Sequence, residues 1–476
     1  MQLLVVEDEP GVAELLVEAA RTRGVEINAR VVTNRDDALL VVRSNDFFDL
    51  AVCDLRIPST QGSLDEDSAF GREVYASLRE TRPGMPICVY SGYADEDFLE
   101  GLVLEQRQGD PYGTGQLGPM VRPIKKLRMT DLVIELERVG SELRFLDRLE
   151  ISTQGVDLGL ALEEDRLLRL VTRRLGGTTG RIAELGQGMS GSRVVLLRAI
   201  DHYGGQIAQC VVKIGTRTDL EEEARRYEQH VPGSLTAACF APVFATFREG
   251  AGGLVGLAYS AAMSNPRSLA AVLADDPAAA CAAVARLQVI EQAWREGGHT
   301  VQLGLDEIGS LLSVGSDPIQ LVAEMDEPLA ERLRSRNVQV VRAVQHGDLH
   351  LGNALIGQSG EPVLIDYGRT GQKLVAYDPV TLELSLAFHP DGRGIAGGWP
   401  TTERASVFDD LDQYLSDCPF PAFVQHCRQW AFDVANGDRE VYACVLSYAA
   451  RQLKFDDTDH DLARAYIWRA ATLLAG

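Results

Sequence analysis

The chain has 476 residues, which is enough for two or three domains with separate cores. Hydrophobic residues make up 45% and charged residues 24%, as in ordinary globular proteins. The formal charge of −23 argues against a nucleic-acid-binding surface, because contact with phosphates requires clustered Lys and Arg.

The cysteines and the first residues indicate the compartment. The eight cysteines form no C-x-x-C pair, which favours buried free thiols in a reducing cytosol. They are Cys53, Cys88, Cys210, Cys239, Cys281, Cys418, Cys427 and Cys444. MQLLVVEDEP has no basic region and turns acidic at Glu7, so it is no signal peptide, and no run reaches the roughly 18 apolar residues of a membrane span. We therefore expect a cytoplasmic protein with neither membrane nor nucleic-acid partners.

Between residues 1 and 149, short apolar runs alternate with amphipathic segments. LLVVE, NARVVT, DLAVCD and PICVYSG have the pattern of strands, whereas GVAELLVEAARTRG, DDALLVVRS and GREVYASLRE have the pattern of helices. Strands separated by helices predict βαβ units on a parallel sheet. Ligands of such a sheet gather outside the carboxyl ends of its strands.

Acidic residues follow two of these strands. The first strand ends at Glu7 and Asp8, and DLAVCD ends at Asp54. Like charges that converge repel each other, and Mg²⁺ is a common way to stabilise them. With the metal bound, Asp54 could accept a phosphoryl group, whose oxygens the hydroxyl of Ser91 could bind after the next strand.

In the order of these motifs, residues 1–149 resemble the receiver domain of two-component response regulators. The resemblance implies a flavodoxin-like (βα)5 fold in which Glu7, Asp8 and Asp54 bind Mg²⁺. It further implies that Asp54 is the phosphoacceptor, Ser91 the switch hydroxyl, and a sensor histidine kinase the phosphodonor. A receiver fold kept only for dimerisation or partner docking is the alternative.

Two positions depart from the receiver pattern. Where the family has a lysine before a proline, the best alignment places Arg122 before Pro123, with Lys125 as a substitute. Arginine keeps the charge but not the compact ammonium geometry. The aromatic switch position falls on Pro119, which cannot swing as a tyrosine side chain does.

A helix is expected from about residue 129 to 150, followed by a helical connector over residues 150–180. The apolar positions of the helix at about 129–150 follow a 4-3-4-3 spacing, namely Leu132, Leu136, Val139, Leu143 and Leu146. This spacing suits a core-facing helix, which we favour because two heptads are short for a coiled coil. A homodimer through the receiver and this helix is the other interpretation.

The remainder divides by composition into a β-rich and an α-rich part. Residues 181–264 contain strand-like runs around glycines, whereas residues 265–476 are mostly helical and rich in alanine. We expect a small β-rich lobe followed by a larger helical lobe.

The stretch VQHGDLHLGNALI carries the clearest chemical pattern. Asp348 is followed five residues later by Asn353, and Asp366 comes 13 residues after that in LIDYG. Phosphoryl transfer from a nucleotide needs an acid that orients the attacking hydroxyl and an amide oxygen that helps to hold a metal against the phosphates. A second carboxylate, here Asp366, bridges to Mg²⁺.

Upstream residues could complete a nucleotide site. LGQGMSG contains Gly186, Gly188 and Gly191 in a G-x-G-x-x-G pattern that lets backbone amides approach phosphate, although a tight hairpin turn would also explain it. Lys213 lies in an apolar β-rich run, where an unpaired ammonium would be unfavourable. In the next helix we prefer Glu223 to Glu222 as its partner, because Glu223 shares a face with Tyr227.

Together these motifs resemble the protein-kinase-like phosphotransferases of the aminoglycoside phosphotransferase and choline kinase branch, over residues 181–385. The resemblance implies a bilobal fold with a largely helical C-terminal lobe, ATP with Mg²⁺, and Asp348 as catalytic base. It implies that Asn353 and Asp366 bind the metal, that His346 fixes the loop, and that His350 packs within it. We expect Asp378 to cap the helix that follows.

The leading hypothesis is a multi-domain α/β and α+β response regulator with an ATP-dependent phosphotransferase output. Phosphorylation of Asp54 would control transfer to a hydroxyl of a small molecule or a protein. A nucleotide-binding pseudokinase that signals by conformation is the alternative.

Overall fold

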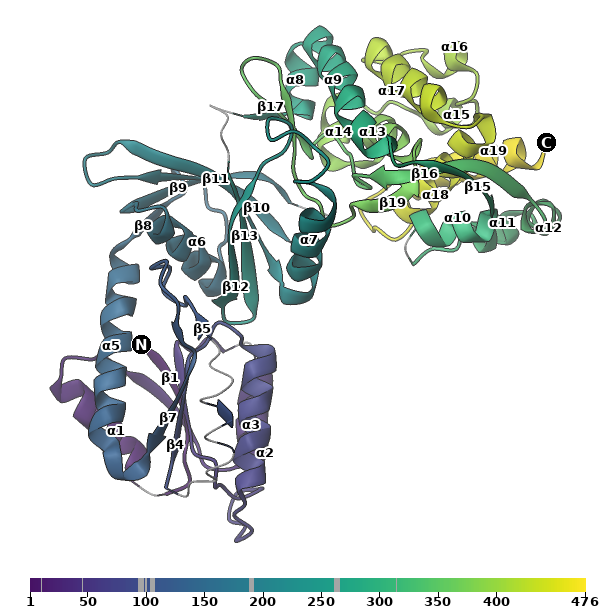
Figure 1. Cartoon of the computed structure of the whole chain (residues 1–476). Helices are drawn as coiled ribbons and strands as arrows, with labels where there is room; N and C mark the ends of the chain where they lie inside the picture. Colours follow the sequence, from purple (N-terminus) through teal and green to yellow (C-terminus); the bar gives the residue numbers. More distant parts are fainter. Residues whose placement is uncertain are drawn as a thin grey trace. The chain divides into compact units, whose positions relative to one another are not determined.

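The computed structural model describes residues 1–9, 11–44, 46–92, 98, 101–102, 108–187, 192–260, 266–313 and 315–476. The chain forms two compact units, residues 1–221 with 243–260, and residues 222–242 with 261–476 (Figure 1). All eight cysteines are free, and six of them are buried. Within the described part of the chain, no helix combines the length and the apolar character that a membrane crossing requires.

The first unit begins with a five-stranded sheet. The strands follow the order β2-β1-β3-β4-β7, and every neighbouring pair is parallel. They are β1 (Gln2–Val6), β2 (Asn28–Val32), β3 (Leu50–Cys53), β4 (Ile87–Ser91) and β7 (Val121–Lys125). The accompanying helices are α1 (Val12–Thr22), α2 (Arg35–Arg43), α3 (Ser68–Thr81), η1 (Lys126–Arg128) and α5 (Met129–Arg148). A two-stranded ribbon pairs β5 (Gln108–Gly109) with β6 (Gly118–Pro119).

Helices cover both faces of this sheet, as its continuous apolar strands require. Leu3 and Val5 of β1 belong to a core that includes α1 and α5, whereas Leu4 and Val6 belong to a second core with α2 and α3 (Figure 1). Helix α2 begins after Asn34, whose side chain accepts a hydrogen bond from the backbone amide of Asp37 at 2.9 Å. The prediction of βα units on a parallel sheet is confirmed for these strands.

The apolar stripe of α5 faces the core of the first unit. Leu132, Leu136, Val139, Leu143 and Leu146 are all buried, in the same core as α1. This packing supports the core-facing interpretation of the stripe. A dimer through residues 1–149 would need another surface.

The second sheet of this unit has six strands in the order β12-β13-β11-β10-β9-β8. They are β8 (Glu150–Ser152), β9 (Thr179–Gln187), β10 (Arg193–Ile200), β11 (Gln206–Thr216), β12 (Val243–Ala251) and β13 (Leu254–Ser260). Helix α6 (Leu162–Arg174) packs on this sheet, and Leu167, Leu168 and Val171 join the core that contains α5. The two sheets therefore share one continuous apolar core.

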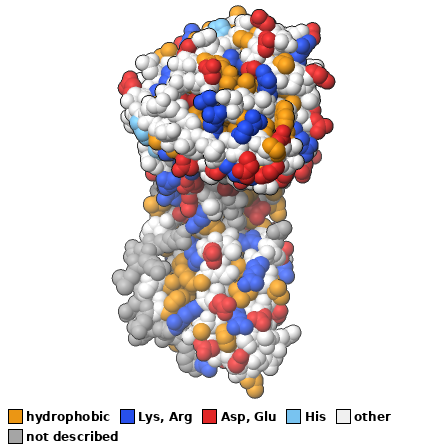
Figure 2. Space-filling model, turned by 90° about the vertical axis from the view of Figure 1, so that its right-hand side faces the viewer, with side chains coloured by type: hydrophobic (Ala, Val, Ile, Leu, Met, Phe, Trp, Pro, Cys, Tyr) orange, Lys and Arg blue, Asp and Glu red, His pale blue; other side chains and the backbone are white. Residues whose placement is uncertain are grey.

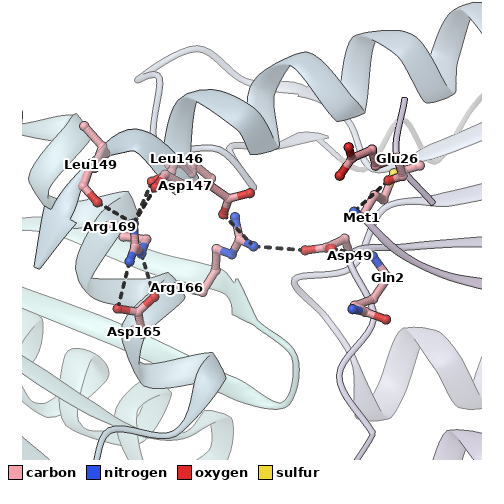
Figure 3. A network of polar contacts seen from close by, with 10 residues as sticks. All are labelled: Met1, Gln2, Glu26, Asp49, Leu146, Asp147, Leu149, Asp165, Arg166 and Arg169. Atoms are coloured by element: carbon pink, nitrogen blue, oxygen red, sulfur yellow. Dashed lines mark hydrogen bonds and ion pairs between the residues drawn. The ribbon is translucent and has the colours of Figure 1, made fainter. Parts of the chain in front are cut away.

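A polar network joins α6 to the first sheet (Figure 3). The Nη2 atom of Arg166 lies 3.3 Å from Oδ1 of Asp49, and the other oxygen of Asp49 accepts the amide of Gln2 at 2.8 Å. Arg169 donates to the carbonyl groups of Leu146 and Leu149 at the end of α5. The segment predicted as a connector is thus built into the unit, because β8 pairs with β9 and α6 fills the space beside α5.

The second unit contains two small sheets and most of the helices. Helix α7 (Arg217–His230) contributes residues from 222 onward. The sheets are β14-β17-β18 and β15-β16-β19, formed by β14 (Arg267–Ser268), β15 (His299–Gly304), β16 (Asn337–Gln345), β17 (Ala354–Ile356), β18 (Pro362–Leu364) and β19 (Gly371–Leu374). The helices before β16 are α8 (Leu269–Asp275), α9 (Pro277–Arg295), α10 (Leu305–Leu312), α11 (Pro318–Met325) and α12 (Glu327–Arg334). Those after β19 are α13 (Tyr377–Phe388), α14 (Pro390–Ala396), α15 (Thr402–Ala405), α16 (Leu411–Tyr414), α17 (Pro421–Val434), α18 (Asp438–Gln452) and α19 (His460–Ala475).

Helix α13 is the centre of this unit. All twelve of its residues are buried, and it packs against α17 and α18. A helix that is buried on every side needs partners for its polar residues. Glu383 finds one in Arg428 of α17, whose Nε lies 2.8 Å from its Oε2. On the face of the molecule in Figure 2, acidic and basic side chains are interspersed rather than gathered by sign.

Candidate functional site

A β-hairpin brings Asn353 and Asp366 together. Strands β17 and β18 pair antiparallel with Ala354 opposite Leu364, so the residues flanking them meet at the open end of the hairpin. The amide of Ile365 donates to the carbonyl of Asn353 at 3.1 Å. Asp366 follows with φ of 65°, a left-handed conformation that non-glycine residues seldom adopt.

Asp348 reaches the same place through a tight turn. The amide of His350 donates to the carbonyl of Asp348 at 2.9 Å, and the amide of Asn353 donates to the carbonyl of His350 at 3.0 Å. The Nδ2 atom of Asn353 donates to the Asp348 carbonyl at 2.9 Å, which leaves its amide oxygen to bind a cation. The five-residue spacing therefore places Asp348 and Asn353 on one turn.

Asp378 supports this turn from beneath. It is fully buried, and its two carboxylate oxygens accept the amides of His346 at 2.6 Å and Gly347 at 2.8 Å. Burial raises the pKa of Asp378, and the nearby His346 and these amides offset part of that shift. The prediction that Asp378 caps the following helix is wrong, because α13 begins at Tyr377 and the carboxylate faces the loop.

The two histidines of the motif have different surroundings. The Nε2 atom of buried His346 lies 2.9 Å from the carbonyl oxygen of Ile365 and so ties the turn to the hairpin. His350 stacks on His389, with ring centroids 3.8 Å apart. Burial and the neighbouring His389 lower the pKa of His350 to about 3, so its ring is neutral at pH 7.

Asp348 is held by two arginines. The Nη1 atom of Arg451 in α18 lies 2.9 Å from its Oδ1, and Nε of Arg369 lies 3.9 Å from its Oδ2. Burial alone would raise the pKa of Asp348, but the charges of Arg451 and Arg369 lower it below its ordinary value. The carboxylate is therefore ionised. Arg451 follows Asp348 by 103 residues, and no local pattern in the sequence points to it.

Glu223 belongs to this region of the second unit. It is buried, and a Cβ placed on Gly368 would lie 3.6 Å from its Oε2 and 3.5 Å from Oδ1 of Asp366. Glu222 instead forms exposed ion pairs with Arg225 and Arg226 on its own helix. Glu222 is thus engaged on its own helix, and the choice of Glu223 as the partner of Lys213 stays a prediction.

The remaining predicted residues of the nucleotide site lie in the first unit. Lys213 is buried in β11, between Val194 of β10 and Leu257 of β13. Gly186 pairs with Val194 near the end of β9. Gly188 and Gly191 lie outside the described residues.

A second group of carboxylates lies at the carboxyl ends of β1 and β3. Glu7, Asp8 and Asp54 offer one oxygen each within 4.8 Å of one another. Glu7 and Asp54 are buried, and burial raises the pKa of Glu7 even though Lys126 lowers it. Ser91 is buried at the end of the neighbouring strand β4. Oxygen ligands in this arrangement suit Mg²⁺.

Lys126, rather than Arg122, reaches these carboxylates. Its Nζ lies 2.8 Å from Glu7, 2.8 Å from Glu9 and 2.7 Å from Asp54. Arg122 lies within β7, opposite Cys88, and its Nε is 3.0 Å from a carboxylate oxygen of Glu135 on α5. The alignment on Pro123 missed Lys126 because the lysine that contacts the carboxylates is the first residue beyond the strand, not the residue before the proline.

Of these two groups of residues, the one that contains Asp348 lies in a segment that matches a known protein family. Residues 265–413, which contain Asp348, Asn353 and Asp366, match the model of the phosphotransferase enzyme family. This match supports an ATP-dependent phosphotransferase. None of the curated proteins matches the chain.

Several solved structures are similar at low identity. An aminoglycoside-3'-phosphotransferase of type VIII is 18% identical, covering 65% of this chain and 100% of its own, with a TM-score of 0.32. The choline kinase LicA from Streptococcus pneumoniae is 15% identical, covering 62% and 94%, with a TM-score of 0.30. The adenylate cyclase from Rhodopirellula baltica is 17% identical, covering 31% and 91%, with a TM-score of 0.23.

Proposed function

We propose that the chain transfers the γ-phosphoryl group of ATP to a hydroxyl group. The observation that carries this proposal is that Asp348, Asn353 and Asp366 meet at one turn and the open end of one hairpin, within the segment that matches the phosphotransferase family. Asp348 would accept a hydrogen bond from the attacking hydroxyl and orient it toward the phosphorus.

Each remaining residue has a proposed part. Asn353 and Asp366 would hold Mg²⁺, which neutralises charge on the phosphates when it is bound. Lys213 and the glycines at 186, 188 and 191 would bind the nucleotide, with Glu223 as the carboxylate that accompanies the lysine. We propose residues 181–264 as the small lobe of this enzyme and residues 265–476 as the large one.

The test is phosphoryl transfer from radiolabelled ATP by the full chain with Mg²⁺. Asp348→Ala should lower the turnover by at least about a thousandfold, because the hydroxyl loses its only orienting acid. Asp412→Ala is the matched control, since Asp412 is an exposed acid at the first turn of α16. Unchanged turnover in Asp348→Ala would remove Asp348 from the mechanism. ATP binding without transfer or hydrolysis would favour the pseudokinase alternative.

We further propose that residues 1–149 are a receiver domain that controls this activity. The strand order β2-β1-β3-β4-β7 is the 2-1-3-4-5 order of flavodoxin-like folds, and the Glu7, Asp8 and Asp54 carboxylates sit at its strand ends. Asp54 would accept phosphate from a sensor histidine kinase, Ser91 would bind the phosphoryl oxygens, and Lys126 would take the part first assigned to Arg122. The shared core of the two sheets offers a path from this site to β9–β13.

Labelling with radioactive acetyl phosphate and Mg²⁺ tests the receiver proposal separately. Asp54→Asn should abolish the label, whereas Asp65→Asn should keep it, because Asp65 is an exposed acid that pairs with Ser59. Equal labelling of both variants would refute Asp54 as the phosphoacceptor without affecting the proposal for Asp348.

A further inference from the structure

The surroundings of Asp348 are richer in positive charge than the protein as a whole. The chain has a formal charge of −23, yet Arg451 and Arg369 both contact this single carboxylate. Arg451 is buried in α18, where an arginine is seldom placed without a partner. One carboxylate cannot neutralise two guanidinium groups.

A lysine adds to this surplus. Lys373 of β19 is buried and runs so close over Gly347 that a Cβ there would collide with its Cε. Gly347 immediately precedes Asp348 in the chain, so this lysine lies beside the same turn.

The other acids nearby are already engaged. Asp378 uses both of its oxygens for the amides of His346 and Gly347. Burial and the neighbouring Asp378 raise the pKa of Glu291 well above its ordinary value. Asp366 is the proposed metal ligand.

The titration of the cations agrees with an unneutralised surplus. Burial and the charge of Arg369 lower the pKa of Lys373 to about 8. Burial and the charge of Arg451 likewise lower the pKa of Arg369. An anion placed among these groups would raise both pKa values again.

Geometry puts the acceptor of the reaction at this place. A group that orients the attacking hydroxyl must lie within hydrogen-bond distance of it, so the acceptor touches Asp348. Groups that lie 2.9 Å and 3.9 Å from Asp348 are therefore within reach of the acceptor's other substituents. Guanidinium groups bind carboxylates and phosphates through paired hydrogen bonds.

We propose that the acceptor is an anionic hydroxyl compound, whose carboxylate or phosphate group binds at Arg369 and Arg451. This inference rests on the proposed phosphotransferase function. The hydroxyl oxygen forms a bond to the γ-phosphorus, the bond from that phosphorus to the β–γ bridging oxygen breaks, and ADP leaves with the electron pair. The hydroxyl proton passes through Asp348 to solvent.

The experiment offers the full chain, with ATP and Mg²⁺, a series of acceptors on one three-carbon skeleton. Glycerol is neutral, glycerate carries a carboxylate, glycerol 3-phosphate carries a phosphate, and 3-amino-1,2-propanediol carries an ammonium group. We expect kcat/KM to be at least about tenfold higher for an anionic member than for glycerol, and lowest for the ammonium compound. Preference for glycerate or for glycerol 3-phosphate decides between a carboxylate and a phosphate. Preference for the ammonium compound would overturn the inference and leave the proposed function intact.

Removal of one arginine makes the test specific to this cluster. Arg369→Gln should raise KM for the anionic acceptor about tenfold more than it raises KM for glycerol, because only the anionic acceptor carries a charged group for residue 369 to bind. The matched control is Arg464→Gln on α19, an exposed arginine paired with Asp461, which should change neither value. Equal effects of Arg369→Gln on both acceptors would refute the assignment.

For compounds that accept phosphate too slowly to measure, the readout is their inhibition of ATP hydrolysis. When ATP is hydrolysed but no compound accepts phosphate, inhibition of that hydrolysis by the anionic members alone supports the inference. Inhibition by the ammonium compound alone, or by none, overturns it. Failure to turn over ATP under any condition would remove the proposed function, and this inference with it.

Discussion

The carboxylate cluster of the first sheet and the Asp348 turn of the second unit have opposite charge imbalances. In the first, one cation, Lys126, contacts Glu7, Glu9 and Asp54, so these contacts leave negative charge in excess. In the second, two arginines contact one carboxylate, Asp348, so these contacts leave positive charge in excess. The comparison shows that the sign of the uncompensated charge at a site, rather than its number of acidic residues, indicates the charge of the ligand. The first arrangement suits a cation, and the second suits an anion.

The largest effect is expected at Asp378, a buried acid that takes no part in either charge imbalance. Asp378→Ala leaves the amides of His346 and Gly347 buried without acceptors, so the free energy of unfolding should fall by about 2–5 kcal/mol. Turnover should fall with it, because the Asp348 turn loses its support. Urea denaturation followed by circular dichroism measures the loss.

Thr381→Val on the same helix is the control. The Thr381 hydroxyl is buried, and within the described residues it has no hydrogen-bond partner. Its replacement by a methyl group should change the free energy of unfolding by less than about 1 kcal/mol. An Asp378→Ala variant as stable as Thr381→Val would show that Asp378 does not hold the turn.

The pH dependence of the free energy of unfolding should reveal Glu440, a buried acid that is bound by backbone amides. Glu440 of α18 is buried and accepts the amides of Val341 at 3.0 Å and Asn436 at 2.9 Å. Burial raises its pKa from 4.5 to about 7, although these amides lower it. Because the folded-state pKa is the higher one, the stabilisation by Glu440 is complete below pH 4.5 and is lost as the pH rises through 7.

Glu440→Gln removes this titration and keeps an acceptor. Between pH 5 and pH 8, the wild type should lose on the order of 3 kcal/mol more stability than Glu440→Gln. Thermal unfolding over this pH range measures the difference, with exposed Glu361→Gln as the control. Parallel pH curves for the wild type and Glu440→Gln would contradict the raised pKa.

The smallest effect is expected at the first cluster, where a metal can compensate. Lys126→Met leaves three carboxylates facing one another and should lower the free energy of unfolding by about 2 kcal/mol without divalent cations. Millimolar Mg²⁺ should restore most of this loss, because the cation replaces the ammonium group.

Lys125→Met is the matched control, since Lys125 is an exposed neighbour at the end of β7. It should behave as the wild type with and without Mg²⁺. A larger response to Mg²⁺ in Arg122→Met than in Lys126→Met would return the role to Arg122.

Local patterns in the sequence predicted the elements that local patterns determine. The alternation of apolar runs located β1, β3 and β4, and the strand-end argument placed Glu7, Asp8 and Asp54 together. The spacing from Asp348 to Asp366 predicted one site because a turn and a short hairpin span that distance.

Long-range pairing was beyond the same reasoning. Arg451 meets Asp348 only because α18 packs against α13 and β16, and nothing near either residue encodes that contact. Asp378 resembled a helix cap because it stands at a helix start, but its partners lie 31 and 32 residues upstream. The four-part division at 149, 180 and 264 stays a prediction of functional parts. Compactness follows a different division, because α6 and β8 complete the first unit's core and sheet.

The path of the chain between its units has a practical consequence for proteolysis. The polypeptide crosses from one unit to the other three times, after residues 221, 242 and 260. The excursion 222–242 is not expendable, because the amide of Leu364 donates to the carbonyl of Cys239 at 3.1 Å and Phe240 bridges to Leu364. A fragment trimmed to residues 265–413 would therefore expose an unpaired strand next to Asp366 and tend to aggregate. A protease that cuts once should yield a nicked protein whose pieces stay associated, rather than two separable domains.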